Sequence, residues 1–157
     1  MNSEPTNFRE MVYTCNQCGV CSGTCPVASL DSGFRPREII QKTQNENILK
    51  LISNGTIWKC AACYNCYEHC PQNVKVTDVI MGLQSEALKE GIAPAKFQKV
   101  MRMVYKNGLT NILVGFVSKQ RKKAGLSDPP GVNVKAVKTI MEKTGVLDFF
   151  KGEEDEK

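Results

Sequence analysis

Cysteine is the residue type in this sequence best suited to chemistry, because thiolate sulfur is a strong ligand for soft metal ions. The 157 residues include eight cysteines, in two groups of four. Each group has the spacing C-x2-C-x2-C-x3-C-P, and the second lies 45 residues after the first. The eight residues are Cys15, Cys18, Cys21, Cys25, Cys60, Cys63, Cys66 and Cys70. This repetition predicts two copies of one binding site rather than eight independent thiols.

Two other uses of four cysteines have to be weighed. Zinc also accepts four thiolates, but zinc sites usually pair two C-x2-C units, whereas each group here is a run of three cysteines followed by Cys-Pro. Disulfides need an oxidising compartment, and the N-terminus MNSEPTNFRE has neither the basic start nor the apolar stretch of an export signal. We therefore expect iron-sulfur clusters in a cytoplasmic protein.

The cysteine spacing resembles that of bacterial two-cluster ferredoxins, in which the fourth cysteine of each motif ligates the other cluster. The resemblance implies two [4Fe-4S] clusters, one held by Cys15, Cys18, Cys21 and Cys70 and the other by Cys60, Cys63, Cys66 and Cys25. With all ligand positions filled by cysteine, His69 is expected to face solvent or to pack beside a cluster. Pro26 and Pro71 are expected to fix where the chain leaves each cluster, because proline lacks a backbone donor.

The segments between and after the motifs must position these loops, and their patterns are those of helices. Apolar residues recur at helical spacing in four segments, each ended by a glycine-containing stop. The segments run from residue 36 to the stop at 54–55, from 76 to 91, from 94 to 107–108, and from 134 to 145. No segment alternates with period two, so the sequence predicts a mainly α protein.

Helices that follow two such motifs resemble the α-helical ferredoxin fold, most strongly over residues 10–90. We expect this fold over 1–92 and a basic helical extension that docks to another subunit over 93–150. Residues 91–150 contain 11 basic and 3 acidic side chains, which concentrates the positive charge there. An acidic tail without structure is expected over 151–157.

A short helical chain with both motifs and a basic extension resembles the C subunit of heterodisulfide reductase. The resemblance implies a cytoplasmic electron-transfer subunit that takes electrons from the flavin-containing A subunit and passes them to the catalytic B subunit. The B subunit carries CCG motifs and reduces the coenzyme M-coenzyme B heterodisulfide in methanogenesis, and hydrogenase or formate dehydrogenase joins the larger complex. The alternative is an equivalent relay in a sulfur-oxidising heterodisulfide reductase-like complex or another CCG-containing dehydrogenase.

The chain itself lacks the sequence signals of a catalytic subunit. None of its 12 glycines form the pattern GxGxxG that binds dinucleotides, and no two of its cysteines are adjacent, as a CCG motif requires. We therefore expect no activity from the isolated chain, in which no residue is assigned a catalytic role.

Two features of the C-terminal half have more than one interpretation. The basic run of Lys119, Arg121, Lys122 and Lys123 is expected to dock an acidic partner, although an iron-sulfur protein that binds nucleic acid is a distant alternative. The apolar residues of the same half either complete the core or are buried against the B subunit; they are Ile112, Leu113, Val114, Phe116, Val117, Leu147, Phe149 and Phe150. No apolar run approaches the ~20 residues of a membrane span, so insertion into a membrane is not expected.

Overall fold

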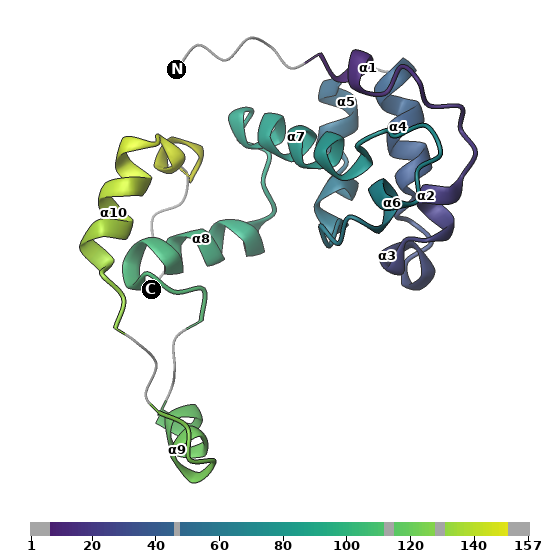
Figure 1. The fold of residues 1–157 in the computed structure, drawn as a ribbon. Coiled ribbons are helices and arrows are strands. Elements are labelled where there is room, and N and C mark those ends of the chain that lie inside the picture. The colour runs from purple at the N-terminus through teal and green to yellow at the C-terminus, as the bar shows by residue number, and fades with distance from the viewer. Residues whose placement is uncertain (1–6, 46–47, 112–114, 128–130, 151–157) are drawn as a thin grey trace. The chain divides into compact units, whose positions relative to one another are not determined.

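The structure is a computed structural model that describes residues 7–45, 48–111, 115–127 and 131–150. These residues form helices joined by loops, and no strand occurs among them (Figure 1). The prediction of a mainly α protein is confirmed. The chain divides into two compact units, Met1–Ala93 and Pro94–Lys157.

The first unit contains both cysteine motifs. The unit combines two longer helices with short helices that carry or follow the cysteines (Figure 1). In chain order they are α1 (Phe8–Met11), α2 (Val20–Gly23), α3 (Pro26–Leu30), α4 (Pro36–Asn45), α5 (Ile48–Ser53), the 3₁₀ helix η1 (Thr56–Lys59), α6 (Asn65–Glu68) and α7 (Val76–Lys89). The predicted helix that starts at Val76 is confirmed, and its stop is Gly91, which has a φ of +72°.

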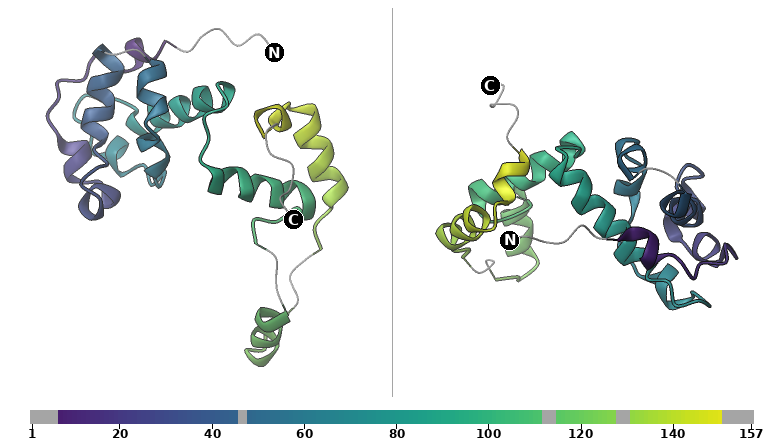
Figure 2. Two further views of the ribbon diagram at one scale, coloured as in Figure 1. Left: turned by 180° about the vertical axis from the view of Figure 1, so that it is seen from behind. Right: turned by 90° about the horizontal axis from the view of Figure 1, so that it is seen from above.

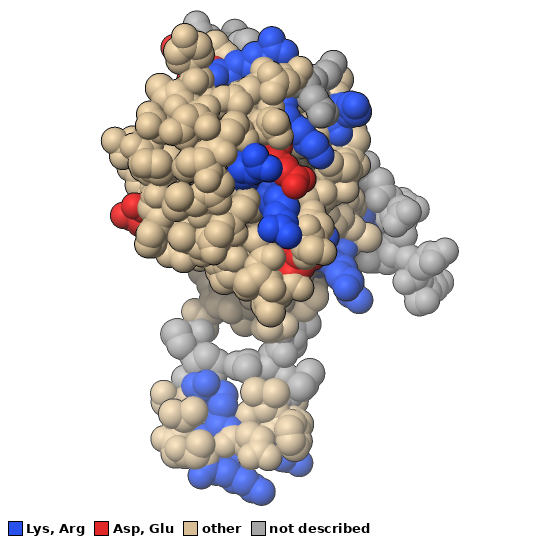
Figure 3. All heavy atoms as spheres, turned by 90° about the vertical axis from the view of Figure 1, so that its right-hand side faces the viewer, with Lys and Arg blue, Asp and Glu red and all other residues tan. Residues whose placement is uncertain are grey.

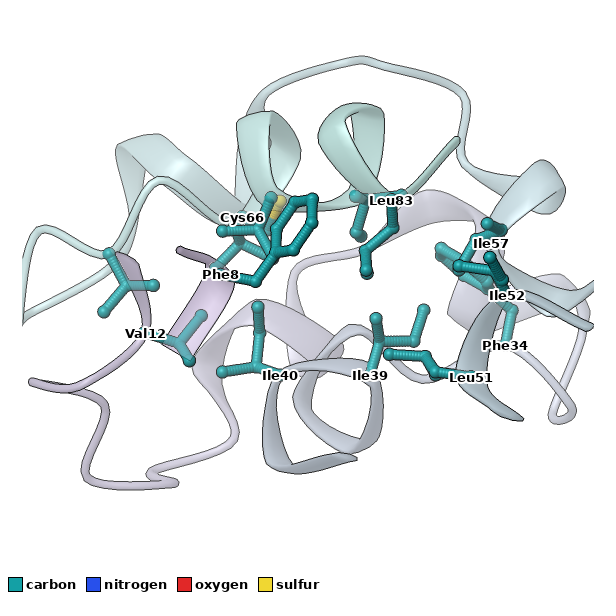
Figure 4. Packing of buried hydrophobic residues seen from close by; sticks show 14 of the residues in the cluster. Phe8, Val12, Phe34, Ile39, Ile40, Leu51, Ile52, Ile57, Cys66 and Leu83 are labelled. Carbon is teal, nitrogen blue, oxygen red and sulfur yellow. The ribbon is translucent and has the colours of Figure 1, made fainter. Parts of the chain in front are cut away.

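The core of this unit lies where α7 packs against α4 and α5 (Figure 4). Helix α4 contributes Ile39 and Ile40, α5 contributes Leu51, and α7 contributes Leu83 from the facing side, all of them buried. The apolar stripe of each helix therefore covers the stripes of the others, and its burial stabilises the unit. Cys66 belongs to the same core, which couples one cysteine motif directly to the packing.

The prediction of one helix from residue 36 to residue 53 is wrong, because α4 and α5 are separate helices that pack together (Figure 2). Residues 41–47 include no aliphatic or aromatic side chain. In a continuous helix Ile40 and Leu51 would lie about three turns, or roughly 16 Å, apart along the axis. Two shorter helices bring both apolar groups against α7.

The second unit contains α8 (Ala95–Asn107), α9 (Gly115–Lys123), α10 (Val134–Lys143) and the 3₁₀ helix η2 (Val146–Phe150). Helices α8 and α10 confirm the two predicted C-terminal helices, with their stops at Gly108 and Gly145, both of which have positive φ. Helix α9 is not among the predicted helices, because its apolar residues Phe116 and Val117 are adjacent and do not recur at helical spacing. Helices α8 and α10 pack against each other, and the Tyr105 hydroxyl donates a hydrogen bond of 3.0 Å to the Glu142 carboxylate between them.

Little of the apolar surface in the second unit is buried. Among its described residues, Met141 is the one fully buried hydrophobic side chain. Phe116 is 70% exposed, so the interpretation that it completes the core is wrong. Leu147 and Phe149 are half-buried, whereas Ile112, Leu113, Val114 and the side chain of Phe150 lie outside the described part of the chain.

Both the backbone conformation and the close packing at Gly108 favour glycine. Its φ of +72° disfavours a side chain, and an added Cβ would overlap Val132 Cγ1. We expect Gly108→Ala to accelerate hydrogen exchange in α8 and α10, because backbone strain of roughly 1–2 kcal/mol adds to crowding of about 1–3 kcal/mol. Gly125→Ala is the matched control, because Gly125 has a φ of +68° but no atom within 4 Å of its added Cβ. If the two variants accelerate hydrogen exchange in their own helices equally, crowding against Val132 contributes nothing at Gly108.

Candidate metal centre

The loop between α1 and α2 presents Cys15 and Cys18, and α2 itself carries Cys21. Gln17 and Gly19 have φ values of +60° and +86°, and these left-handed turns wrap the chain tightly on either side of Cys18. The side chain of Asn16 caps the loop by accepting a hydrogen bond of 3.3 Å from the Cys18 N–H. A tight loop of this kind directs successive cysteine side chains toward one centre.

The second motif repeats this backbone at the same offset of 45 residues as the cysteines. Ala62 and Tyr64 have φ values of +49° and +61°, at the positions that correspond to Gln17 and Gly19. Helix α6, over Asn65–Glu68, likewise corresponds to α2, over Val20–Gly23. Positive φ is uncommon in residues other than glycine, so three such residues in two equivalent loops indicate a shared structural demand.

The two copies differ after their fourth cysteines. Pro26 is the first residue of α3, where its missing N–H costs nothing. Pro71 instead enters a turn that continues through Asn73, with a φ of +53°, and the Val74 N–H donates a hydrogen bond of 3.3 Å to Cys70 Sγ. Both prolines mark the exit of the chain from a cysteine loop.

One cavity, partly open to solvent, is lined by cysteines from both motifs. Cys15, Cys18 and Cys21 come from the first motif and Cys70 from the second. Arg37 and Ile40 of α4 line the same cavity, together with residues next to the cysteines. The structure therefore brings together the four residues predicted to hold one cluster.

The other four cysteines also lie together. The thiols of Cys25 and Cys63 are close enough to those of Cys60 and Cys66 to raise their pKa values. Cys25 is buried, and Thr24 before it accepts a hydrogen bond of 2.9 Å from the Asn65 side chain of α6. That bond joins the end of the first motif to the second.

Burial raises the pKa values of three of the eight thiols. It raises the pKa of Cys21 to about 11, and the neighbouring thiols of Cys66 and Cys15 add to the rise. Burial likewise raises the pKa of Cys60 and of Cys66, although the Thr77 hydroxyl opposes the rise at Cys66. Without metal these thiols are protonated at neutral pH, so metal binding must displace their protons.

Several hydrogen bonds to cysteine sulfur accompany the loops, and they include the backbone N–H of Ser22 at Cys21 and that of Ala62 at Cys60. Besides the Val74 N–H at Cys70, the Gln17 side-chain amide donates to Cys15 Sγ at 3.5 Å, and Thr77 Oγ1 lies 3.2 Å from Cys66 Sγ. Gln17 is itself held by Gln44 of α4, at 3.2 Å. Sequence reasoning identified none of these partners, because nothing in the pattern of residues indicates which side chains approach the sulfurs.

His69 does not join the cysteines. Its side chain is exposed, and its Nδ1 lies 2.9 Å from the carbonyl oxygen of Asn65 in the same turn. The expectation that His69 faces solvent is confirmed.

The described thiols do not gather closely around one point. Among the described residues, no three side chains of His, Cys, Asp or Glu converge closely enough to hold one metal ion. A tetrahedral zinc site needs four sulfurs at about 2.3 Å from one centre. A four-iron cluster holds its sulfur ligands farther apart, as four cysteines around one cavity allow.

Comparison with known proteins defines the class. Residues 11–74 match the 4Fe-4S dicluster domain family, which spans both cysteine motifs. The chain is thus an iron-sulfur protein with two [4Fe-4S] clusters, and this decides against the zinc and disulfide alternatives. Beyond this class, the chain is 32% identical to the C subunit of a heterodisulfide reductase over most of that protein, and it therefore belongs to this family.

Relatives from methanogens carry the family assignment. The chain is 32% identical to the C subunit of the ferredoxin/F420H2-dependent CoB-CoM heterodisulfide reductase of Methanosarcina acetivorans, over 76% of this chain and 73% of that protein. It is 29% identical to the C subunit of the ferredoxin:CoB-CoM heterodisulfide reductase of Methanosarcina mazei, over 91% and 88%. It is 34% identical to the iron-sulfur C subunit of the CoB-CoM heterodisulfide reductase of Methanopyrus kandleri, over 76% and 62%. The relatives are subunits of an oxidoreductase complex.

The match covers only part of some relatives. The chain spans 62% of the length of the Methanopyrus kandleri protein. None of the helices in the described residues has the length and apolar character needed to cross a bilayer.

Proposed function

We propose that the two motifs exchange their fourth cysteines when they bind the clusters. Cluster I would be held by Cys15, Cys18, Cys21 and Cys70, and cluster II by Cys60, Cys63, Cys66 and Cys25. The cavity lined by the first four thiols supports this assignment, as does the proximity of Cys25 to Cys60 and Cys66. Neither cluster is then complete without both motifs, so the clusters join residues 1–92 into one folding unit.

We further propose that the chain is the electron relay of a cytoplasmic heterodisulfide reductase complex. The observation that supports this proposal is that Cys21 lies beside Cys66, so that the proposed third ligands of the two clusters would be neighbours. Each cluster, when bound, takes up and releases one electron. All eight cysteines serve as ligands, so they leave no coordination position for a substrate, and the chain transfers electrons without catalysing the reduction.

The proposed partners follow from the family. The chain would receive electrons from the flavin-containing A subunit and pass them to the CCG-containing B subunit, which reduces the heterodisulfide of coenzyme M and coenzyme B. A hydrogenase or formate dehydrogenase would join the larger complex. A cytoplasmic location suits eight free cysteines, because thiols stay reduced there.

Residues 93–150 are proposed as the docking extension, ahead of the tail at 151–157. Helix α9 supports this role, because residues 115–127 carry four basic side chains and no acidic one (Figure 3). Lys119, Lys122 and Lys123 are exposed, whereas Arg121 donates a hydrogen bond of 2.7 Å to the Ser127 carbonyl. Arg121 therefore braces the turn after α9, and the three lysines remain as the proposed contact with an acidic partner.

Cluster content and magnetic coupling test the relay proposal. Anaerobically prepared protein should contain about eight iron and eight acid-labile sulfide per chain. The reduced protein should give an electron paramagnetic resonance spectrum with spin-spin interaction, because Cys21 and Cys66 place the two clusters close together. Two magnetically isolated centres would contradict the arrangement, and about four iron per chain would contradict the assignment of all eight cysteines.

A further inference from the structure

The Thr77 hydroxyl is the hydrogen-bonding group that lies against the sulfur of Cys66. Thr77 Oγ1 and Cys66 Sγ are 3.2 Å apart, and the two residues are 1% and 7% exposed. Thr77 lies in the first turn of α7, and Cys66 belongs to α6, which packs against that helix. Both groups are therefore shielded from water by the core that contains Leu83 and Ile80.

The direction of this hydrogen bond follows from the chemistry of a bound cysteine. A thiol and a hydroxyl can each donate, but a thiolate that ligates iron has no proton left to give. Only the Thr77 hydroxyl can then be the donor. The place of Thr77 in the helix favours donation to sulfur. Thr77 is the second residue of α7, so no helical carbonyl lies four residues before it to accept its hydroxyl proton.

A second buried threonine shows the ordinary alternative. Thr43 of α4 is 0% exposed, and its hydroxyl donates a hydrogen bond of 2.8 Å to the carbonyl of Ile39, four residues earlier. This hydrogen bond lies within α4 and involves no cysteine sulfur. Thr43 and Thr77 thus differ in what the hydroxyl binds, although both are buried threonines in helices.

We propose that Thr77 is a positioning residue that raises the reduction potential of cluster II by donating a hydrogen bond to Cys66. The inference rests on the proposed role of Cys66 as a ligand of that cluster. Reduction adds one electron, and the negative charge on the sulfur ligands increases. A hydroxyl dipole aimed at sulfur favours the more negative state, and exclusion of water leaves that effect unscreened.

The proposed ligands of cluster I have hydrogen-bond donors of their own. Of these ligands, Cys15 and Cys70 receive hydrogen bonds from the Gln17 side-chain amide, at 3.5 Å, and from the Val74 backbone N–H, at 3.3 Å. A change at Thr77 leaves both of these donors in place. The two clusters can therefore be tuned separately, which an electron relay requires if its two sites are to differ in potential.

The test is a potentiometric titration of the cluster-loaded protein and its Thr77→Val variant. Valine keeps the shape of the side chain and replaces the hydroxyl with a methyl group. One of the two reduction waves should move to lower potential by the equivalent of roughly tenfold in the equilibrium constant, about 59 mV for one electron. Thr77→Ser retains the donor and should retain the wild-type potential. Thr43→Val is the matched control and should leave both waves in place.

A shift caused by Thr43→Val as large as that caused by Thr77→Val would overturn the proposal, as would unchanged waves in Thr77→Val. If the valine variant does not retain its clusters, Thr77→Ala removes the same donor without adding a methyl group. Electron-nuclear double resonance on the reduced wild-type protein, reconstituted in H₂O and in D₂O, gives an independent measurement. An exchangeable proton coupled to one cluster, absent from Thr77→Val, supports the hydrogen bond, and its absence from the wild type overturns it.

Iron content distinguishes failure of this inference from failure of the proposed function. Wild-type protein with about eight iron per chain and a Thr77→Val variant with unchanged potentials would reject only the role of Thr77. A Cys66→Ala variant that keeps both clusters would reject the ligand assignment itself.

Discussion

Replacement of Cys25 by serine should remove the cluster that the second motif holds, although Cys25 belongs to the first motif. Iron should fall from about eight to about four per chain, because one cubane loses a ligand and the other keeps all four. The physical reason is that Cys25 is buried beside Cys60 and Cys66, while Cys70 lines the cavity of the first motif. Iron analysis and the spectrum of the remaining cluster measure the result.

Companion variants identify which cluster is lost. Cys25→Ser and Cys66→Ser should leave the same remaining cluster and give the same spectrum, whereas Cys21→Ser should leave the other one. The double variant of Cys25 and Cys66 should lose no more iron than either single variant, because both residues serve one cluster. The double variant of Cys25 and Cys21 should lose both clusters. A Cys25→Ser spectrum that matches Cys21→Ser would refute the exchange of ligands, and Cys25→Ala repeats the test if the serine oxygen retains iron.

Loss of one cluster should also loosen the first unit. Ligation and folding are coupled, and Cys66 is packed in the same core as Leu83. Faster proteolysis within residues 1–92 of Cys25→Ser is the expected sign.

The local structure of the site was the part most open to prediction from sequence. Cysteine spacing constrains the backbone. The two motifs, 45 residues apart in sequence, therefore form equivalent loops followed by equivalent short helices, α2 and α6. The positive φ values at Gln17, Ala62 and Tyr64 were not predictable from residue type, because glycine marks only one of the equivalent positions, Gly19. At these positions the geometry of the loop imposes a positive φ that the residue type itself disfavours.

Contacts between distant segments were out of reach for a different reason. Gln44 approaches Gln17 from 27 residues away, and Thr77 approaches Cys66 from 11 residues away. Both contacts depend on how α4 and α7 pack against the cysteine loops, and apolar spacing gives the face of a helix but not its partner. The break between α4 and α5, in contrast, had a signal in the absence of apolar residues at 41–47.

Addition of this chain to the flavin-containing and CCG-containing subunits should restore heterodisulfide reduction that those two subunits do not support without it. The chain alone should give no turnover, because its cysteines are all assigned as cluster ligands and it has neither a nucleotide-binding fingerprint nor a CCG motif. Anaerobic assay of the released coenzyme thiols, with the reduced flavin-containing subunit as the electron source, measures the result. Turnover by the isolated chain, or full activity of the other two subunits without it, would contradict the relay proposal.

The same assay tests the docking surface on α9. Lys119→Glu, Lys122→Glu and Lys123→Glu together should slow association with the partner by tenfold or more at low salt, since opposite charges accelerate encounter by about 10- to 1,000-fold. Arg121 is left unchanged because it holds the Ser127 carbonyl. The matched control reverses three exposed lysines on α8 and α10, Lys96, Lys99 and Lys135, and lowers the net charge equally. If α9 is the contact, only its variant loses rate, and the loss should fade toward 1 M salt, where the Debye length is about 3 Å. Equal losses in the two variants would show attraction to the charge of the whole chain instead, and unchanged kinetics would reject α9 while leaving the relay itself in place.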